Sequence, residues 1–116
     1  MTTQSSDLTH QKCVPCEGGT KPLTRDEFQV YLDSVDGWEV INNETSIQKT
    51  VEQKNFSQAV RFINQIAEIA EAEGHHPDIF LHDYKKLTIT LSTHAINGLS
   101  INDFILAAKI DQKSKE

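Results

Sequence analysis

Four of the five histidines of the chain lie close together in the sequence, at positions His75, His76, His82 and His94. Histidine is the side chain whose unperturbed pKa, about 6.5, allows it both to donate and to accept a proton near neutral pH. A cluster of imidazoles on short segments therefore favours proton-transfer chemistry, in which one ring acts as the acid and another as the base.

The spacing of the residues around these histidines is specific. Glu71 is followed after three free positions by His75-His76-Pro77, and Tyr84, His94 and Asp103 follow at intervals of six, nine and eight positions. This pattern resembles that of the pterin-4a-carbinolamine dehydratases. The resemblance extends from Gly37-Trp38 to about Asp111, and the Cys-Val-Pro-Cys-Glu-Gly-Gly run that begins at Cys13 is similar to the lead-in of some bacterial and plant members.

The resemblance implies a hydro-lyase that removes water from a 4a-hydroxytetrahydropterin. The substrate would be 4a-hydroxytetrahydrobiopterin, the product the quinonoid dihydropterin, and the purpose the recycling of the cofactor of aromatic amino acid hydroxylases. Such an elimination needs an acid for the departing hydroxyl and a base for a ring-nitrogen proton, so two histidines would suffice without a metal or a redox cofactor.

The resemblance also implies roles for particular residues. His75 and His94 would be the acid/base pair, and His76, a further catalytic candidate, would shape and bind the pterin edge together with Pro77. The expected substrate-binding set is His75, His76, Pro77, Thr93, His94, Ala95 and Ile96. Glu71 and Asp103 would support the site by orienting imidazoles, and Tyr84 would line the pocket.

Each assignment has a simpler rival. Histidines that follow a helix often only complement its C-terminal dipole, Asp103 can be explained as a helix cap, and Glu71 can serve to solvate a helix end. His82 is expected to face solvent, and neither it nor His10 matches a family site position.

Two other classes of function remain open. The four clustered histidines could bind zinc or iron, although no His-x-x-x-His helical pair exists and adjacent histidines do not readily face one ion. A binding role is the second, because some animal members of the resembled family also bind a transcription factor as a dimerisation partner. The family further implies a homodimer or homotetramer.

Helix and strand patterns predict the scaffold. Thr24 to Glu27 forms a capping box that begins a helix, and apolar residues recur at helical spacing from Phe56 to about Glu73, where Gly74 can end the helix. Ser100 and Asp103 cap a last helix. Strands are expected over 38–41, 46–52, 78–83 and 86–92, the last with alternating Leu87, Ile89 and Leu91. The order α-β-β-α-β-β-α predicts an α+β fold, a four-stranded antiparallel sheet with three helices on one face.

Composition limits the remaining possibilities. A chain of 116 residues is of single-domain size. Its 17 acidic and 11 basic side chains give a net charge of −6, which argues against nucleic-acid or anionic-membrane partners. No apolar run is long enough for a membrane span, and we expect a cytoplasmic protein.

The domain is expected to span residues 23–111, with a tail over 112–116 and a flexible arm over 1–22. The arm carries Cys13 and Cys16, which we interpret as a reduced, inert pair; metal binding and a redox role stay open, with His10 the only other ligand near in sequence. Because the arm lies outside the histidine pattern, it is expected to be dispensable for the chemistry.

Overall fold

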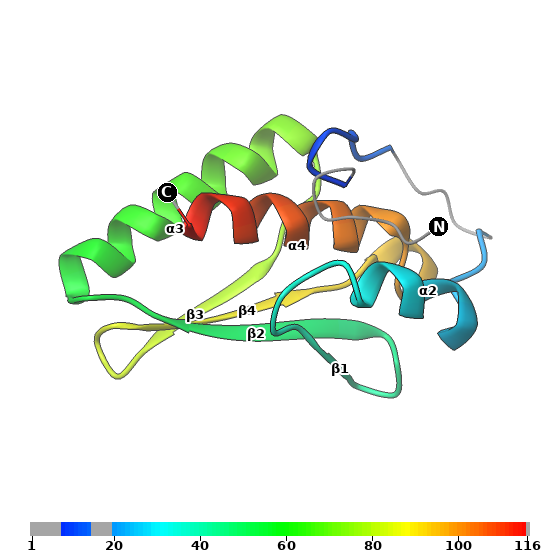
Figure 1. Cartoon of the computed structure of the whole chain (residues 1–116), viewed down its shortest axis with the longest axis horizontal. Coiled ribbons are helices and arrows are strands. Elements are labelled where there is room, and N and C mark those ends of the chain that lie inside the picture. The colour runs from blue at the N-terminus through cyan, green and yellow to red at the C-terminus, as the bar shows by residue number, and fades with distance from the viewer. Residues whose placement is uncertain (1–7, 15–19, 116) are drawn as a thin grey trace.

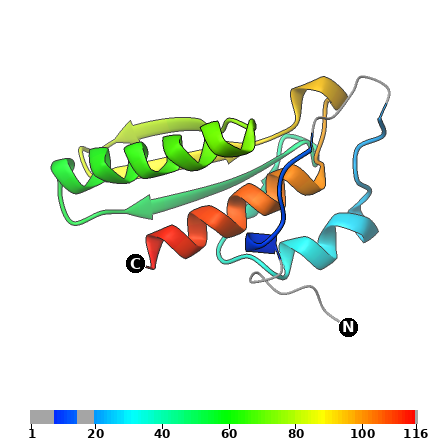
Figure 2. The same ribbon diagram turned by 90° about the horizontal axis from the view of Figure 1, so that it is seen from above.

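A computed structural model describes residues 8–14 and 20–115 of the chain. Its elements follow one another as α2 (Arg25–Leu32), β1 (Glu39–Ile41), β2 (Ser46–Glu52), α3 (Phe56–Glu73), β3 (Asp78–His82), β4 (Lys86–Leu91), the 3-10 turn η1 (His94–Ile96) and α4 (Ile101–Ser114). The strands form one antiparallel sheet in the order β1-β2-β4-β3. Helices α2, α3 and α4 cover one face of it (Figures 1 and 2), which confirms the predicted fold class.

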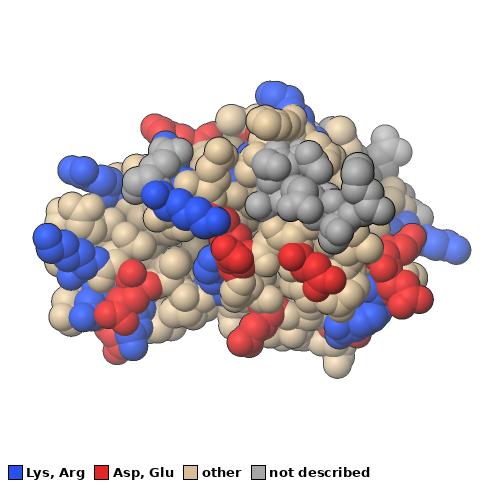
Figure 3. Space-filling model, viewed as in Figure 1, with Lys and Arg blue, Asp and Glu red and all other residues tan. Residues whose placement is uncertain are grey.

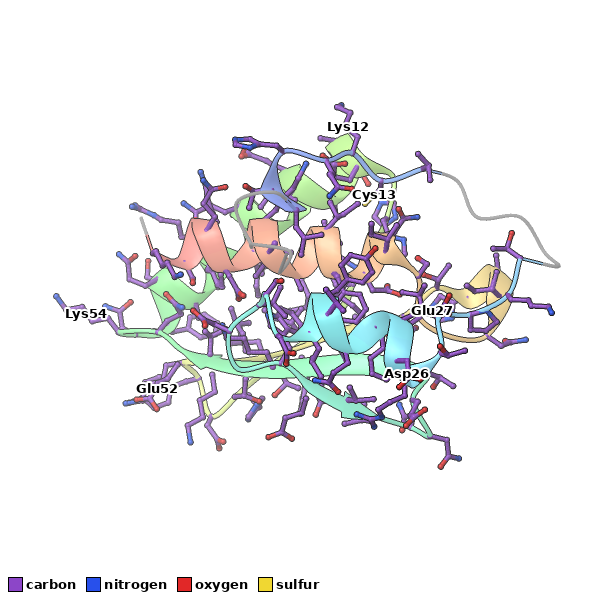
Figure 4. All side chains as sticks on the ribbon, turned by 45° about the vertical axis from the view of Figure 1, so that its right-hand side comes forward. Lys12, Cys13, Asp26, Glu27, Glu52 and Lys54 are labelled. Atoms are coloured by element: carbon purple, nitrogen blue, oxygen red, sulfur yellow. The ribbon has the colours of Figure 1, made fainter. Side chains whose placement is uncertain are left out.

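The helices begin where the capping residues predict. The Thr24 hydroxyl accepts a hydrogen bond from the Glu27 amide, and the Glu27 carboxylate accepts one from the Thr24 amide at 2.8 Å. Figure 4 shows Glu27 and its neighbour Asp26 on α2. Ser100 and Asp103 form the same reciprocal pair at the start of α4. These contacts satisfy amides that a helix N-terminus otherwise leaves unpaired.

Helix α3 is bounded by a cap at each end. The Asn55 side chain accepts a hydrogen bond from the Gln58 amide, and Gly74 ends the helix in the left-handed conformation at φ 65°. Glycine adopts that conformation without the strain that a Cβ atom imposes. His75 and His76 therefore leave the helix directly after its last turn.

The central strands carry the core of the sheet. Leu87, Ile89 and Leu91 of β4 are fully buried beneath the helices, and β2 pairs with β4 along its length. On the opposite face Thr50 and Thr88 share a hydroxyl hydrogen bond of 2.9 Å. This alternation fixes the register, since a slip by one residue would turn the apolar side chains to solvent. Strand β4 ends at Leu91, and residues 92–94 follow it.

Two segments differ from the expectation. Helix α4 continues to Ser114, into the predicted tail, because Gln112 and Lys113 are good helix formers and no breaker follows Asp111. Residues 8–14, expected to be part of a flexible arm, pack on the domain, and Leu8 is fully buried in the core. An apolar side chain of this size gains roughly 1.5–3 kcal/mol from burial. The proposed boundary of the folded unit therefore moves toward the N-terminus.

The surface has no single charge character on the face seen in Figure 3, where basic and acidic side chains are interspersed. This distribution agrees with the modest net charge of −6. Within the described residues, no helix combines the length and the apolar character that crossing a membrane requires.

Candidate active site

Three segments that are distant in sequence meet at one end of the sheet. They are the elbow after α3, the loop after β4, and the first turn of α4. Between them lies a cavity of about 350 Å³ lined by Val14, Gly74, His75, His76, Ser92, Thr93, His94, Ala95 and Asn102. Small-molecule sites typically measure roughly 300–1,000 Å³, so the volume suits a small ligand. Three of the predicted site histidines line this one cavity.

His75 is held by a buried carboxylate. Its Nε2 lies 2.7 Å from Oδ1 of Asp103, with the histidine side chain 12% exposed and the aspartate side chain 0% exposed. Because an ionised carboxylate only accepts hydrogen bonds, an ionised Asp103 requires Nε2 to be the donor in this contact. Nδ1 is then the ring nitrogen that can take up or release a proton.

Asp103 joins the site to the helix cap. Its Oδ2 accepts hydrogen bonds from the Thr93 hydroxyl at 2.8 Å and from the Ser100 amide at 3.0 Å. The Thr93 and Ser100 hydroxyls are also 2.8 Å apart. Capping and support of the imidazole are therefore not alternatives at Asp103, since one carboxyl oxygen serves each. The Asp103 carboxylate therefore links the loop after β4, the start of α4 and His75 through hydrogen bonds.

His76 has a different partner. Its Nε2 lies 2.6 Å from Oε2 of Glu71, and both side chains are largely exposed. Pro77 restricts His76 to extended backbone conformations, so the adjacent imidazoles contact separate carboxylates. Glu71 orients His76, whereas Asp103 orients His75. Exposed pairs of this kind contribute little stability, typically about 0–1 kcal/mol.

A tight loop presents His94, which is exposed at the start of η1. The Thr93 amide donates to the Gly98 carbonyl at 2.9 Å, and Asn97 takes the left-handed conformation. A Cβ atom on Gly98 would lie 2.5 Å from the Cβ of Pro22. Only glycine fits there without displacing Pro22, so the segment before α2 helps to hold the loop of His94.

Glu73, the last residue of α3, forms a second ion pair, and this pair is mostly buried. Its Oε2 lies 2.6 Å from Nζ of Lys109, and its Oε1 accepts a hydrogen bond from the Cys13 amide at 2.9 Å. Burial raises the pKa of Glu73, but these two hydrogen bonds and the charges of Lys109 and Lys12 outweigh that effect, so its pKa lies below the ordinary value.

The structure brings together most of the predicted set. His75, His76, Thr93, His94 and Ala95 line the cavity, whereas Pro77 and Ile96 are not among its lining residues. Ile96 is instead a core residue, 7% exposed.

One expectation outside the set is wrong. Tyr84 is 62% exposed at the turn between β3 and β4, at the end of the hairpin opposite the cavity, and does not line it. His82 lies with exposed Phe80 on the sheet face away from the helices, where it stacks on Phe80 and hydrogen-bonds Thr88 at 2.8 Å. Among the described residues, no three His, Cys, Asp or Glu side chains gather in a metal-binding arrangement.

Sequence reasoning missed several lining residues, namely Val14, Gly74, Ser92 and Asn102. Gly74 was recognised only as a helix end, and Ser92 only as the last residue of a strand. Asn102 and Val14 lie outside the histidine pattern. The nearest available signal was the lead-in at Cys13, which is shared with some family members but suggests no role by itself.

Comparison with known proteins now identifies the family. The family model described as pterin 4 alpha carbinolamine dehydratase matches residues 21–113. The chain belongs to the pterin-4a-carbinolamine dehydratase family. This confirms the family expected from the sequence and, with it, the enzyme class, a dehydratase.

Individual relatives agree. A protein of Alkaliphilus metalliredigens, provisionally named a pterin-4-alpha-carbinolamine dehydratase, is 43% identical over 112 residues, which are 96% of this chain and 99% of the relative. The mitochondrial pterin-4-alpha-carbinolamine dehydratase 2 of Arabidopsis thaliana is 40% identical over 96% of this chain and 61% of its own length.

Solved structures share the fold. The crystal structure of a transcriptional coactivator/pterin dehydratase from Brucella melitensis superposes with a TM-score of 0.74 at 34% identity, covering 79% of this chain and 97% of that one. A pterin dehydratase-like protein described as a RuBisCO assembly factor has a TM-score of 0.56 at 21% identity, over 66% of this chain and 87% of its own. The second likeness is one of fold alone.

Proposed function

We propose that the cavity dehydrates a pterin-4a-carbinolamine, 4a-hydroxytetrahydrobiopterin, to the quinonoid dihydropterin. The observation that carries the proposal is the pairing of two imidazoles on one cavity: His75, whose Nε2 is held by buried Asp103, and His94 on the loop after β4. Family membership supports the same chemistry.

The proton balance needs only these two side chains. One protonated imidazole donates its proton to the departing 4a-hydroxyl, which leaves as water when the C4a–O bond breaks. The other, neutral imidazole accepts the proton of a ring nitrogen, whose electron pair forms the new double bond. One histidine loses a proton and the other gains one, so exchange with solvent restores both.

The remaining lining residues bind rather than transfer protons. His76, oriented by Glu71, would contact the polar edge of the pterin, and the backbone of Ala95 would offer hydrogen-bonding groups to it. Thr93, whose hydroxyl donates to Asp103 and whose amide donates to Gly98, would hold the wall of the cavity. In this role the enzyme recycles the cofactor that an aromatic amino acid hydroxylase leaves in the carbinolamine form. The hold of Asp103 on His75 suits such an elimination, because orientation of a proton-transfer group lowers the barrier.

We also propose a homodimer or homotetramer. Support comes from β3, which is an edge strand of five residues and exposes Phe80 at 64%. Edge strands with unpaired backbone groups and large apolar side chains favour pairing with another chain.

The decisive experiment is a dehydratase assay with freshly generated carbinolamine, in which formation of quinonoid dihydropterin is followed by absorbance. We expect the wild-type chain to exceed the uncatalysed rate, and the double variant H75A/H94A to lose that acceleration. A wild-type rate equal to the uncatalysed one would refute the enzyme and favour a binding role.

A further inference from the structure

The segment over residues 8–14 is anchored at both of its ends. Leu8 is fully buried in the core, and the Cys13 amide donates to Oε1 of Glu73. Figures 1 and 2 show this blue segment crossing α4 toward the end where that helix begins. In Figure 4, the labelled Lys12 and Cys13 lie on the same segment, beside the last turn of α3.

Asn102 fixes the next residue, Val14, by two hydrogen bonds. The Val14 amide donates to Oδ1 of Asn102 at 3.0 Å, and Nδ2 of Asn102 donates to the Val14 carbonyl at 2.5 Å. Asn102 is only 3% exposed. A buried side chain amide that pairs with both polar groups of one residue holds that backbone as a neighbouring strand would. Asn102 also adjoins Asp103, which holds His75.

Val14 nevertheless keeps its side chain largely uncovered. It is 59% exposed and lines the cavity of the three histidines. The other apolar lining residues, Gly74 and Ala95, have little or no side chain. A fixed backbone thus holds the largest apolar side chain of the cavity against an otherwise polar lining.

We propose that Val14 is a substrate-contact residue that packs against a face of the pterin ring, and that Asn102 is the residue that positions it. A heteroaromatic ring has polar edges, which the histidines can bind, and apolar faces, which need an apolar contact. A branched, rotationally restricted side chain supplies that contact with little loss of conformational entropy. This inference rests on the proposed function, and it reverses the expectation that the arm is dispensable.

The test compares Val14→Ser, Val14→Ile and a matched control, Val30→Ser. Val30 is also an exposed valine, 42% exposed, but lies on α2 and does not line the cavity. We expect V14S to raise KM about three- to tenfold, the scale of part of one apolar side chain's burial, with kcat within about threefold. V14I should stay within about twofold of wild type, and V30S should change neither constant.

Asn102→Ala tests the positioning role. If Asn102 acts through Val14, N102A should raise KM as V14S does. The KM of the double variant V14S/N102A should then lie within about twofold of the KM of V14S alone. Two independent losses would instead multiply. Thermal unfolding of each variant checks that the fold is retained, and multiplied losses in folded protein would overturn the role of Asn102.

Binding of 7,8-dihydrobiopterin, measured by calorimetry, separates this inference from the proposed function. A wild type without dehydratase activity would refute the proposed function, whereas unchanged dihydrobiopterin affinity and unchanged KM in V14S would overturn the contact at Val14. A threefold or greater loss of affinity in V14S, with none in V30S, supports the contact whatever the turnover. A wild type that binds no dihydrobiopterin and shows no turnover refutes both.

Discussion

His75 and Asp103, 28 positions apart in the sequence, meet at 2.7 Å between Nε2 and Oδ1, with the aspartate side chain fully buried. His75 follows the last turn of α3, and Asp103 belongs to the first turn of α4. The same carboxyl group that completes the helix cap therefore sets the tautomer of the imidazole. When one ring nitrogen of a histidine is held in a hydrogen bond, the other nitrogen is the one that can take part in proton transfer.

The two roles of Asp103 can be separated by mutation. Asp103→Asn keeps the shape and an oxygen for the cap but replaces the charged acceptor of His75, so we expect kcat to fall about 10- to 100-fold, below the roughly 10²–10⁴-fold contribution of a proton-transfer group itself. Steady-state kinetics with the carbinolamine would measure this.

Ser100→Ala is the matched control for the cap. It removes a capping hydroxyl, at a cost of about 1 kcal/mol in unfolding free energy, and leaves the His75–Asp103 contact in place. We expect its kcat to stay within about threefold of wild type, with a lower thermal midpoint. Equal losses of kcat in D103N and S100A would mean that Asp103 acts only through the fold.

The histidines should differ sharply from one another. Replacing His75 or His94 by alanine should lower the rate about 10²–10⁴-fold, the usual contribution of one positioned proton-transfer group. The double variant should lose less than the product of the two, because both groups act in one elimination step. His76→Ala should chiefly raise KM, since His76 is exposed and bound only to Glu71.

His82→Ala serves as the control in the same series. His82 contacts Phe80 on β3 and Thr88 on β4, and it does not line the cavity. Its loss should leave turnover within about twofold, a barrier change under ~0.5 kcal/mol. Similar, mild effects at all four histidines in folded variants would refute the assignment.

Local patterns were enough to predict the scaffold. The capping boxes at Thr24 and Ser100 and the left-handed Gly74 depend on neighbouring residues only, so their outcome could be read from spacing. The alternation of β4 likewise predicts its buried face, because side chains of a strand point alternately to its two sides. These local features also place His75 and His94 at element ends.

Contacts between distant segments were not available to the same reasoning. Nothing local indicates that Asn102 pairs with Val14, 88 positions away, or that Leu8 enters the core. Nor does the local pattern of β2 indicate that Lys49 pairs at 2.8 Å with Asp111 of α4. Tyr84 was misplaced because spacing along a hairpin does not reveal which end of it forms the site.

Asp111 should be a major stabilising residue outside the active site. Its side chain, 5% exposed, accepts hydrogen bonds from Trp38 Nε1 at 3.0 Å, from Lys49 Nζ at 2.8 Å and from the Asp36 amide at 3.0 Å. Asp111→Ala removes all three and leaves the mostly buried ammonium of Lys49 without this carboxylate, so we expect a loss of about 3–5 kcal/mol in unfolding free energy.

Urea titration followed by the fluorescence of Trp38, the single tryptophan of the chain, would measure that loss. Asp26→Asn is the control: Asp26 is exposed in the first turn of α2 and should contribute under about 1 kcal/mol through the helix dipole. A loss below 1 kcal/mol for D111A would show that the three contacts do not stabilise the fold.

Self-association can be tested on the edge strand β3. Light scattering at micromolar concentration should give a mass of at least two chains, about 26 kDa from twice 13.1 kDa. If Phe80 lies in the contact, Phe80→Asp should shift the mass toward 13.1 kDa, whereas Tyr84→Asp, an equally exposed aromatic at the hairpin turn, should not. A monomeric wild type would refute the proposed assembly.

Glu73 should link the stability of the fold to pH. Its pKa is lowered in the folded protein, because the hydrogen bonds from Lys109 and Cys13 outweigh the opposing effect of burial. The unfolded chain therefore binds the proton more readily, and the stabilisation is fully present above the ordinary glutamate pKa of about 4.3 and is lost as pH falls through the lower folded value. At pH 7, Glu73→Gln should cost about 1–3 kcal/mol, the scale of hydrogen bonds to a charged group.

Urea titration from pH 7 to about pH 3 would measure the difference in unfolding free energy between wild type and E73Q. It should be constant down to about pH 5 and shrink below the ordinary glutamate range, because protonation makes the wild-type carboxyl as neutral as the glutamine. Glu68→Gln, on the exposed side of the same helix, should show neither the loss nor its pH dependence. Since Glu73 also binds the Cys13 amide, E73Q should raise KM by loosening the segment that carries Val14. A stability difference that persists unchanged to pH 3 would mean that the ionised carboxylate of Glu73 is not its source.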